Sequence, residues 1–479
     1  MQEGYIKKDK RKKILLITDD IRVHSGVAQV GREMVLNSSH RFNWVQMAGA
    51  VKHPDFGKGP IDFSEEINNA MGKDTDAYCK LYPVNGYGDG NFLRQVIKAE
   101  KPDALFLITD PRYFIYVFEM ENEIRKNIPI IYLNIWDDLP APMYNREYYD
   151  SCDALFGISK QTVNINKMVL GDKVKDKVIK YIPHGLNHHI FKPVDENDKE
   201  LSDFRNQVYG GGETDFCLLF NSRNIRRKNC ADTILAWKLF TDKLSEEEKK
   251  KVTMVMHTDP VHDAGTDLNA VIDYFFESPE DHRIRISATS FDSKYMNLLY
   301  NCADGVILVS NAEGWGLSLT ESMLTATPFI ATVTGGMQDQ MRFEDNLGNW
   351  IDFNSDFPSN HRGTYKKHGE WVLPVFPSAH NIVGSPITPY IYDDHHRQED
   401  TAEQIYNLYK MGKKERKRRG ELGKKWALGD EAGFTSEKMA KRIEEGLDEL
   451  FNTWKPRKRF ELIKDTDYEP RVLPHNIEY

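Results

Sequence analysis

Residues 305–321 read Gly-Val-Ile-Leu-Val-Ser-Asn-Ala-Glu-Gly-Trp-Gly-Leu-Ser-Leu-Thr-Glu, and this stretch predicts more of the fold than any other. Its first five residues are typical of a short buried strand, because they are apolar and are followed by polar Ser310. A glycine-bracketed turn follows Glu313, and an apparent helix then leads to Glu321. Residues 328–333 form the next strand pattern. The order strand, glycine-rich turn, helix, strand is typical of an α/β sheet with a ligand site at its edge.

The turn and the start of the helix also indicate the kind of ligand. Free backbone N–H groups and the positive end of a helix dipole favour an anion. Carboxylates are unfavourable beside a phosphate unless they face hydroxyl groups, and the hydroxyls of a sugar or a ribose meet that need. Glu313 in the turn and Glu321 on the helix therefore predict a nucleotide-sugar site.

Length and composition set the broad class of the protein. The 479 residues suggest two or three domains, and 40% hydrophobic with 29% charged residues is ordinary for a globular protein. No apolar run is long enough to span a membrane, and the basic N-terminus lacks the apolar core of a secretion signal. The 5 cysteines are scattered, which argues against a disulfide framework or a zinc site and favours the reducing cytoplasm. A net charge of −9 argues against a surface that coats nucleic acid but leaves a local basic groove open.

Strand patterns alternate with helical patterns along the chain, which predicts parallel, doubly wound sheets. We expect strands of the first half at residues 13–18, 79–84, 104–108, 129–135 and 154–158. The pattern restarts at residue 216, after a polar segment around residues 194–198.

We therefore place one Rossmann-like, acceptor-side domain at residues 1–205 and a second, nucleotide-sugar-binding domain at residues 206–435. Residues 436–479 are expected to form a last helix and a charged tail. Residues 353–396 are rich in Pro, His and aromatic residues and are predicted to be irregular, which is unusual for so long a connection.

A second charged motif follows the first strand of the second domain. Residues 220–229 read Phe-Asn-Ser-Arg-Asn-Ile-Arg-Arg-Lys-Asn, and such a loop lies at the carboxyl edge of the sheet. Arg223 offers a planar fork to phosphate oxygens and Lys228 a compact charge, so together they suit a diphosphate leaving group. A solvated basic turn is the alternative for this cluster taken alone.

In combination these motifs resemble retaining glycosyltransferases of the GT-B fold, specifically glycosyltransferase family 4. The E-x7-E motif of that family is matched by Glu313 and Glu321. Its Gly-Arg followed five positions later by Lys is matched by Arg223 and Lys228, although Ser222 replaces the glycine.

The segment between the domains adds a third match, because residues 182–193 contain Ile-Pro-His-Gly-Leu-Asn and end in Phe-Lys-Pro. Residues 136–140 and 182–185 are more similar to a phage-type branch than to membrane-glycolipid enzymes. The loop after the first strand departs from the family, since His24-Ser25-Gly26 has one glycine where the family has two.

The resemblance implies two Rossmann-like domains facing each other across a cleft, with the C-terminal helix crossing back to the first domain. It implies a hexosyl- or pentosyltransferase that moves a sugar, with retention, from a nucleotide-diphosphate sugar to an acceptor hydroxyl, without a metal or another cofactor. A glycan, a lipid, a small molecule and a hydroxymethylated pyrimidine in DNA remain open as acceptors, and so does peripheral membrane contact. A catalytically silent carbohydrate-binding or scaffold subunit and a nucleotide-sugar epimerase are the alternative functions.

The motifs, the resemblance and the expected positions at the ends of strands together suggest roles for individual residues. The expected catalytic residues are Arg223, Lys228 and Glu313. Donor binding is expected from Glu321, Gly314, Trp315, Gly316, Leu317, Ser25 and Gly26. The expected acceptor-side residues are Asp137, Asp138 and His184. We expect the acceptor to enter from the first domain, bordered by Ser25 and Gly26, by the glycine-rich turn at residues 86–90 and by Asp137.

Overall fold

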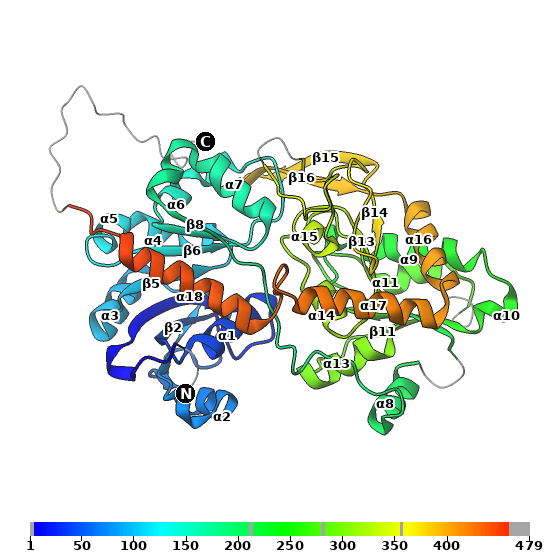
Figure 1. Cartoon of the computed structure of the whole chain (residues 1–479), viewed down its shortest axis with the longest axis horizontal. Helices are drawn as coiled ribbons and strands as arrows, with labels where there is room; N and C mark the ends of the chain where they lie inside the picture. Colours follow the sequence, from blue (N-terminus) through cyan, green and yellow to red (C-terminus); the bar gives the residue numbers. More distant parts are fainter. Residues whose placement is uncertain (1–3, 210–213, 279–282, 355–357, 459–479) are drawn as a thin grey trace.

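The computed structural model describes residues 4–209, 214–278, 283–354 and 358–458, so the predicted tail after residue 458 lies outside the described residues. Two α/β units stand side by side, one built from the first part of the chain and one from the middle part (Figure 1). Each is organised around its own, largely parallel sheet. None of the described helices combines the length and the apolar composition needed to cross a bilayer.

The first sheet has the strand order β3-β4-β2-β1-β5-β6-β7-β8, and all neighbours are parallel except β3 and β4. Its strands are β1 (Lys12–Asp19), β2 (Phe42–Ala50), β3 (Ile61–Asp62), β4 (Cys79–Asn85), β5 (Ala104–Ile108), β6 (Ile130–Asn134), β7 (Ala154–Gly157) and β8 (Val178–Tyr181). The helices around it are α1 (Gly26–Ser38), α2 (Ser64–Met71), α3 (Gly90–Glu100), α4 (Ile115–Glu119), α5 (Glu121–Ile124), α6 (Arg146–Asp150) and α7 (Lys160–Leu170). Side-chain caps from Ser25, Asp89 and Ser159 begin α1, α3 and α7, which fixes where the chain leaves the sheet edge.

The second sheet has the order β11-β10-β9-β12-β13-β14 and is parallel throughout. Its strands are β9 (Phe216–Asn221), β10 (Val252–His257), β11 (Ile284–Ser287), β12 (Gly305–Leu308), β13 (Phe329–Thr332) and β14 (Val372–Val375). The helices of this part are α8 (Lys199–Tyr209), α9 (Cys230–Thr241), α10 (Glu246–Lys249), α11 (Leu268–Phe275), α13 (Ser293–Cys302), α14 (Leu317–Leu324), α15 (Met337–Met341), α16 (Gln398–Lys410) and α17 (Gly412–Leu428). The four residues of β12 are all buried, as the apolar run at residues 305–309 predicts.

Several elements differ from the prediction, because β2, β3, β8, β14, β15 (Ala379–Ser385) and β16 (Thr388–His395) were not predicted as strands. Strand β2 was missed because Gln46 and Gly49 interrupt its apolar run; the Gln46 amide is buried and donates to the carbonyl of Asp19 (2.7 Å). The prediction of an irregular stretch at residues 353–396 is wrong, since it contains β14 and an antiparallel hairpin of β15 and β16. The hairpin was not evident because β15 is largely exposed and β16 is mostly half-buried, so neither strand shows a regular alternation of buried and exposed residues.

The chain crosses between the domains twice, and the two crossings run side by side. Leu186 N donates to the carbonyl of Phe434 (3.2 Å), and Ser436 N donates to the carbonyl of Leu186 (3.0 Å). A Cβ on Gly185 would lie 2.1 Å from the carbonyl oxygen of Thr435, so only glycine allows this approach.

After the second crossing, α18 (Ser436–Thr453) packs against α1 and β8 of the first domain (Figure 1). Its buried residues recur every three or four positions, which gives the helix one apolar face. The predicted return of the C-terminal helix to the first domain is therefore confirmed.

Candidate active site at the facing sheet edges

The strand order of each sheet determines where a ligand site is expected. In each sheet, the early strands are added on one side of the first strand and the later strands on its other side. The strand order therefore reverses between β1 and β5 in the first sheet and between β9 and β12 in the second. Open α/β sheets bind ligands at the carboxyl ends of strands at such a switch point. Residues 222–229 follow β9 and residues 309–316 follow β12, so the two predicted charged motifs flank one switch point.

The centre of this edge is a group of paired charges. The Lys228 ammonium pairs with the Glu313 carboxylate, and Arg227 Nη1 lies 3.3 Å from Glu313 Oε2. The same guanidinium reaches Asp137 of the first domain, with Nε 3.5 Å from Oδ2. Lys228 and Glu313 are each 8% exposed, and burial of such charges is tolerated only because they are paired. Arg227 thus joins the two domains at the site.

Arg227 was not among the predicted site residues. Its only signal in the sequence is its place in the run Arg226-Arg227-Lys228, because the five-residue spacing from Arg223 selects Lys228 and not Arg227. Arg223, which was predicted, is exposed and has no ion pair within the described part of the chain.

The loops that carry these charges are joined to each other by hydrogen bonds. Asn229 has a left-handed backbone (φ 52°), and its amide donates to the carbonyl of Val309 (2.8 Å) and contacts Asn311. Asn311 N in turn donates to the carbonyl of Arg227 (2.8 Å). These bonds hold Lys228 against Glu313 and explain the position of both motifs.

Glycines allow a third loop, residues 333–336 between β13 and α15, to approach Glu313. Gly336 N donates to the carbonyl of Glu313 (2.9 Å), and a Cβ on Gly336 would lie 1.9 Å from the carbonyl oxygen of Gly314. Gly314 itself meets the first domain, because a Cβ there would lie 2.7 Å from the carbonyl oxygen of Ile135.

Glu321 lies on α14 and faces a different set of groups. Its carboxylate accepts from the hydroxyl of Tyr300 and lies 3.5 Å from Nδ2 of Asn221. Burial raises the pKa of Glu321 to about 7. Neither Tyr300 nor Asn221 was predicted, since Tyr300 comes from α13 and meets Glu321 only in the folded chain.

The remaining predicted donor residues in the second domain lie around the start of α14. Gly316 is the N-cap of this helix, and Leu317 is its first residue. A Cβ on Gly26 would lie 3.3 Å from a methyl group of Leu317, so the starts of α1 and α14 meet across the domain boundary. Trp315 is buried and donates to the hydroxyl of Thr320 (3.0 Å), which places its indole in the core.

At the matching edge of the first domain, hydroxyl groups surround the Asp19 carboxylate. Ser25 accepts from Ala28 N (3.0 Å) as the cap of α1, and its hydroxyl donates to Asp19 Oδ2 (2.5 Å). Tyr87, in the predicted glycine-rich turn, donates to the other oxygen of Asp19 (2.6 Å). Asp19 and Tyr87 were not predicted individually.

The three predicted acceptor-side residues occupy three different environments. Asp137 is partly exposed and points toward Arg227. Asp138 is buried and accepts from Leu139 N and from Gln161 (both 2.7 Å); burial and the nearby Asp394 raise its pKa well above the ordinary value. His184 lies in the first crossing, where burial lowers its pKa to about 3.

The hairpin β15–β16 links the two domains beside this site (Figure 1). On the first domain, the carbonyl of Leu139 accepts from Tyr392 N (2.7 Å) and Tyr144 donates to the carbonyl of Tyr390 (2.9 Å). Arg112 donates to the carbonyl of Ile387 (3.0 Å) near the tip.

On the second domain, the hairpin is fixed next to the charged loops. Asp394 N donates to the carbonyl of Asn311 (2.8 Å), and the Asp394 carboxylate accepts from Thr334 (2.6 Å). Thr334 also lies 3.1 Å from Asp138. The hairpin is therefore part of the contact between the domains.

Comparison with known proteins identifies the fold. No protein-family model and no curated protein matches the chain. Solved structures that resemble it include Anabaena Alr3699/HepE in complex with UDP and glucose (TM-score 0.61, 14% identity, 92% of this chain and 100% of that chain). They also include sucrose-phosphate synthase from Thermosynechococcus elongatus (TM-score 0.63, 14% identity, 92% and 100%). A third is an E. coli structure described as trehalose-6-phosphate bound with UDP-2-fluoro glucose (TM-score 0.61, 10% identity, 91% and 99%).

These structures are GT-B glycosyltransferases, and the similarity extends over nearly the whole chain. The predicted fold class is thereby confirmed: two Rossmann-like domains face each other across a cleft, and the C-terminal helix crosses back. At these identities the likeness establishes the fold and not the activity.

Proposed function

We propose that this chain is a retaining glycosyltransferase that moves a hexosyl or pentosyl group from a nucleotide-diphosphate sugar to an acceptor hydroxyl. The observation that carries the proposal is the group of Lys228, Arg227 and Glu313 at the switch point of the second sheet, with Glu321 on the following helix. The fold supports it, because structures similar to this chain contain UDP, UDP-glucose or UDP-2-fluoro glucose.

In this proposal the cations stabilise the leaving group. Transfer breaks the bond between the anomeric carbon and a diphosphate oxygen, so negative charge develops on the departing phosphate. Arg223 is exposed at this edge, and Lys228 is held in place by Glu313 and by the bonds of Asn229. A diphosphate would compete with Glu313 for the lysine, which would leave the glutamate to accept from a hydroxyl of the transferred sugar.

We assign the ribose hydroxyls to Glu321, because its carboxylate lies beside the hydroxyl of Tyr300 and the amide of Asn221. Retention without an obvious general base is explained if the leaving phosphate itself takes the proton of the acceptor hydroxyl. Neither role calls for a metal ion.

We place the acceptor on the first domain, bordered by Ser25, Gly26, the turn at residues 86–90 and Asp137. One acceptor that we propose is a hydroxymethylated pyrimidine in DNA, because residues 136–140 and 182–185 resemble the phage-type branch of family 4. Such a base would have to leave the base stack to reach the donor. The rate of sugar transfer to DNA would fall steeply as the salt concentration rises, because DNA binding releases counterions. A glycan, a lipid or a small molecule would show little loss with salt.

A donor panel tests the proposed function. The purified chain is incubated with nucleotide-diphosphate sugars, with and without acceptors and with excess chelator, and free nucleotide and products are measured. We expect nucleotide release that is stimulated by one acceptor class, persists in chelator and yields a product with the anomeric configuration of the donor. Conversion of a donor without acceptor would indicate an epimerase, and absence of any turnover or nucleotide binding would indicate a silent subunit; either result contradicts the proposal.

A further inference from the structure

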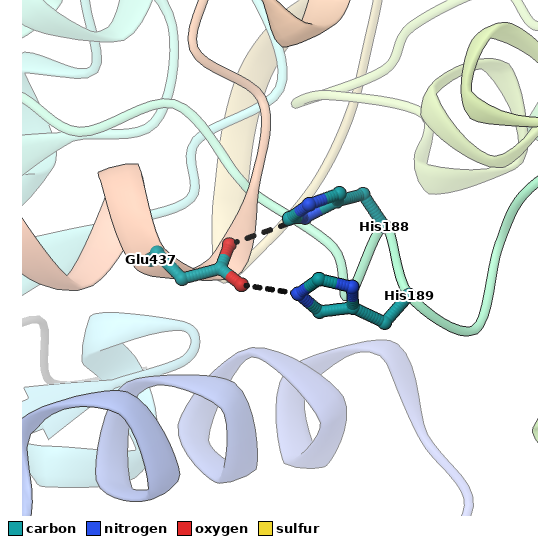
Figure 2. Close-up of side chains that lie close together, drawn as sticks. All are labelled: His188, His189 and Glu437. Atoms are coloured by element: carbon teal, nitrogen blue, oxygen red, sulfur yellow. Dashed lines mark ion pairs between the residues drawn. The ribbon is translucent and has the colours of Figure 1, made fainter.

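The two crossings between the domains bring three metal-binding side chains together (Figure 2). His188 and His189 lie in a turn after the first crossing, and Glu437 lies in the first turn of α18. His188 Nδ1 is 3.4 Å from Glu437 Oε2, and His189 Nε2 is 3.6 Å from Glu437 Oε1. The proposed transfer chemistry uses none of these three residues.

The chemistry and the spacing of these atoms fit zinc. Two imidazole nitrogens and one carboxylate oxygen form a common zinc ligand set, with metal–ligand bonds of about 2.0–2.1 Å. Bonds of that length in a tetrahedron separate neighbouring ligand atoms by about 3.3–3.4 Å. His188 Nδ1 and His189 Nε2 approach different oxygens of Glu437, at 3.4 and 3.6 Å. With one ligand atom taken from each residue, the three donor atoms lie within 4.8 Å of one another, so small side-chain rotations bring them to the tetrahedral spacing.

Interactions among the three side chains leave one polar atom unsatisfied. His188 Nδ1 is buried and has no hydrogen-bond partner within the described part of the chain, although it faces Glu437. The rings of His188 and His189 have centroids only 4.0 Å apart, so both imidazoles lie on the same side of Glu437. A divalent cation between them would give His188 Nδ1 a partner and would supply the positive charge that the Glu437 carboxylate attracts.

The backbone already holds the ligands in place. Asn187 Oδ1 accepts from His189 N (3.0 Å), and the carbonyl of Asn187 accepts from Phe191 N (3.0 Å), which fixes the turn. The hydrogen bonds between Leu186 and the second crossing hold this turn beside the start of α18. Little conformational entropy is therefore lost when a metal binds.

We propose that His188, His189 and Glu437 form a Zn²⁺ site that ties the first crossing to the start of the last helix. The side chains of His189 and Glu437 are 74% and 47% exposed, so water has access to the fourth position. Because both segments connect the domains, the bound ion would cross-link the two connections beside the hydrogen bonds of Leu186. The site goes beyond the proposed transferase activity and does not depend on it.

Zinc titration of the full chain tests this site. The protein is first dialysed against chelator and then titrated by calorimetry, and thermal unfolding is followed with and without Zn²⁺. We expect one equivalent of zinc to bind with a Kd on the order of micromolar, and the Tm to rise by several degrees because the ion binds only the folded crossing.

Two single substitutions, His189→Ala and Glu437→Gln, should each abolish this equivalent and the Tm shift. Both side chains are largely exposed, so the variants should fold, which their Tm without metal will show. His262→Ala removes another exposed histidine and should bind zinc as the native chain does. The proposal is overturned if no zinc binds at concentrations on the order of 100 µM, or if both variants retain the equivalent.

Discussion

The two sheets have equivalent switch points, yet the loops at these points have different chemistry. The edge of the second sheet holds Lys228, Arg227 and Glu313 as paired charges. At the edge of the first sheet, the Asp19 carboxylate lies between the hydroxyls of Ser25 and Tyr87, and the neighbouring Asp20 is paired with Arg22. The fold thus provides two similar positions, and in our proposal the side chains suit one to a diphosphate and the other to an acceptor with hydroxyl groups.

The largest effect is expected at the charged edge. Lys228→Ala should lower turnover by about a hundredfold, because one fixed contact to a leaving group typically contributes about 3 kcal/mol to the transition state. Steady-state kinetics with the preferred donor measures this loss.

The control for this variant is Lys250→Ala, which removes an exposed lysine of the same domain. Circular dichroism must show that Lys228→Ala is folded, since the substitution leaves Glu313 with Arg227 as its remaining cation. Near-native turnover in a folded Lys228→Ala protein would contradict the assignment of the second edge to the diphosphate.

The next effect separates the two glutamates of that edge. Glu321→Ala should weaken binding of the free nucleoside diphosphate by roughly tenfold or more, because a hydrogen bond to a charged group contributes about 1.5–3 kcal/mol. Glu313→Ala should leave this binding nearly unchanged and damage transfer, since we assign Glu313 to the sugar. Calorimetry with the nucleotide alone decides the matter, and the reverse pattern would exchange the two roles.

The pH dependence of nucleotide binding sharpens the same assignment. The folded pKa of Glu321 is raised from 4.5 to about 7, so the group gains a proton as the pH falls through about 7. Binding to the ribose should then weaken, by up to about tenfold per pH unit.

The stability of the protein should change in the opposite sense. Between pH 4.5 and about 7, the unfolded chain releases the Glu321 proton while the folded chain keeps it. The free energy of unfolding therefore falls as the pH rises across this window. Glu321→Gln should therefore raise the Tm more at pH 8 than at pH 5. Asp339 and Glu444 also have pKa values of about 7 in both proteins, so only the difference between variant and native chain tests Glu321. If the Tm of Glu321→Gln and the Tm of the native chain changed in parallel between pH 5 and pH 8, Glu321 would not titrate as described.

The two edges also differ in how far the sequence predicts them. Lys228 and Glu313 can be found because they follow apolar strand patterns at characteristic spacings. Arg227, Asp19 and Tyr300 cannot, because their importance comes from partners on other loops that are distant in the chain. The hairpin was missed for a related reason: it is held by contacts to the first domain, such as that of Tyr392 with Leu139, and not by an apolar pattern of its own.

The smallest effect is expected where the hairpin contacts the first domain. Arg112→Ala removes the hydrogen bond to the carbonyl of Ile387 (3.0 Å) and the contact with Thr388 near the tip. Partly exposed contacts of this kind contribute about 0.5–1.5 kcal/mol, so the KM for the acceptor should rise only about two- to tenfold while nucleotide binding stays unchanged. Hydrogen exchange of the backbone amides of Ser385, Ile387, Thr388 and Tyr390 should become faster. Arg94→Ala, which breaks an exposed pair with Glu123 in the same domain, is the matched control and should change neither quantity. If Arg112→Ala instead weakened nucleotide binding, the hairpin would belong with the charged edge, and the division between the two edges would have to be redrawn.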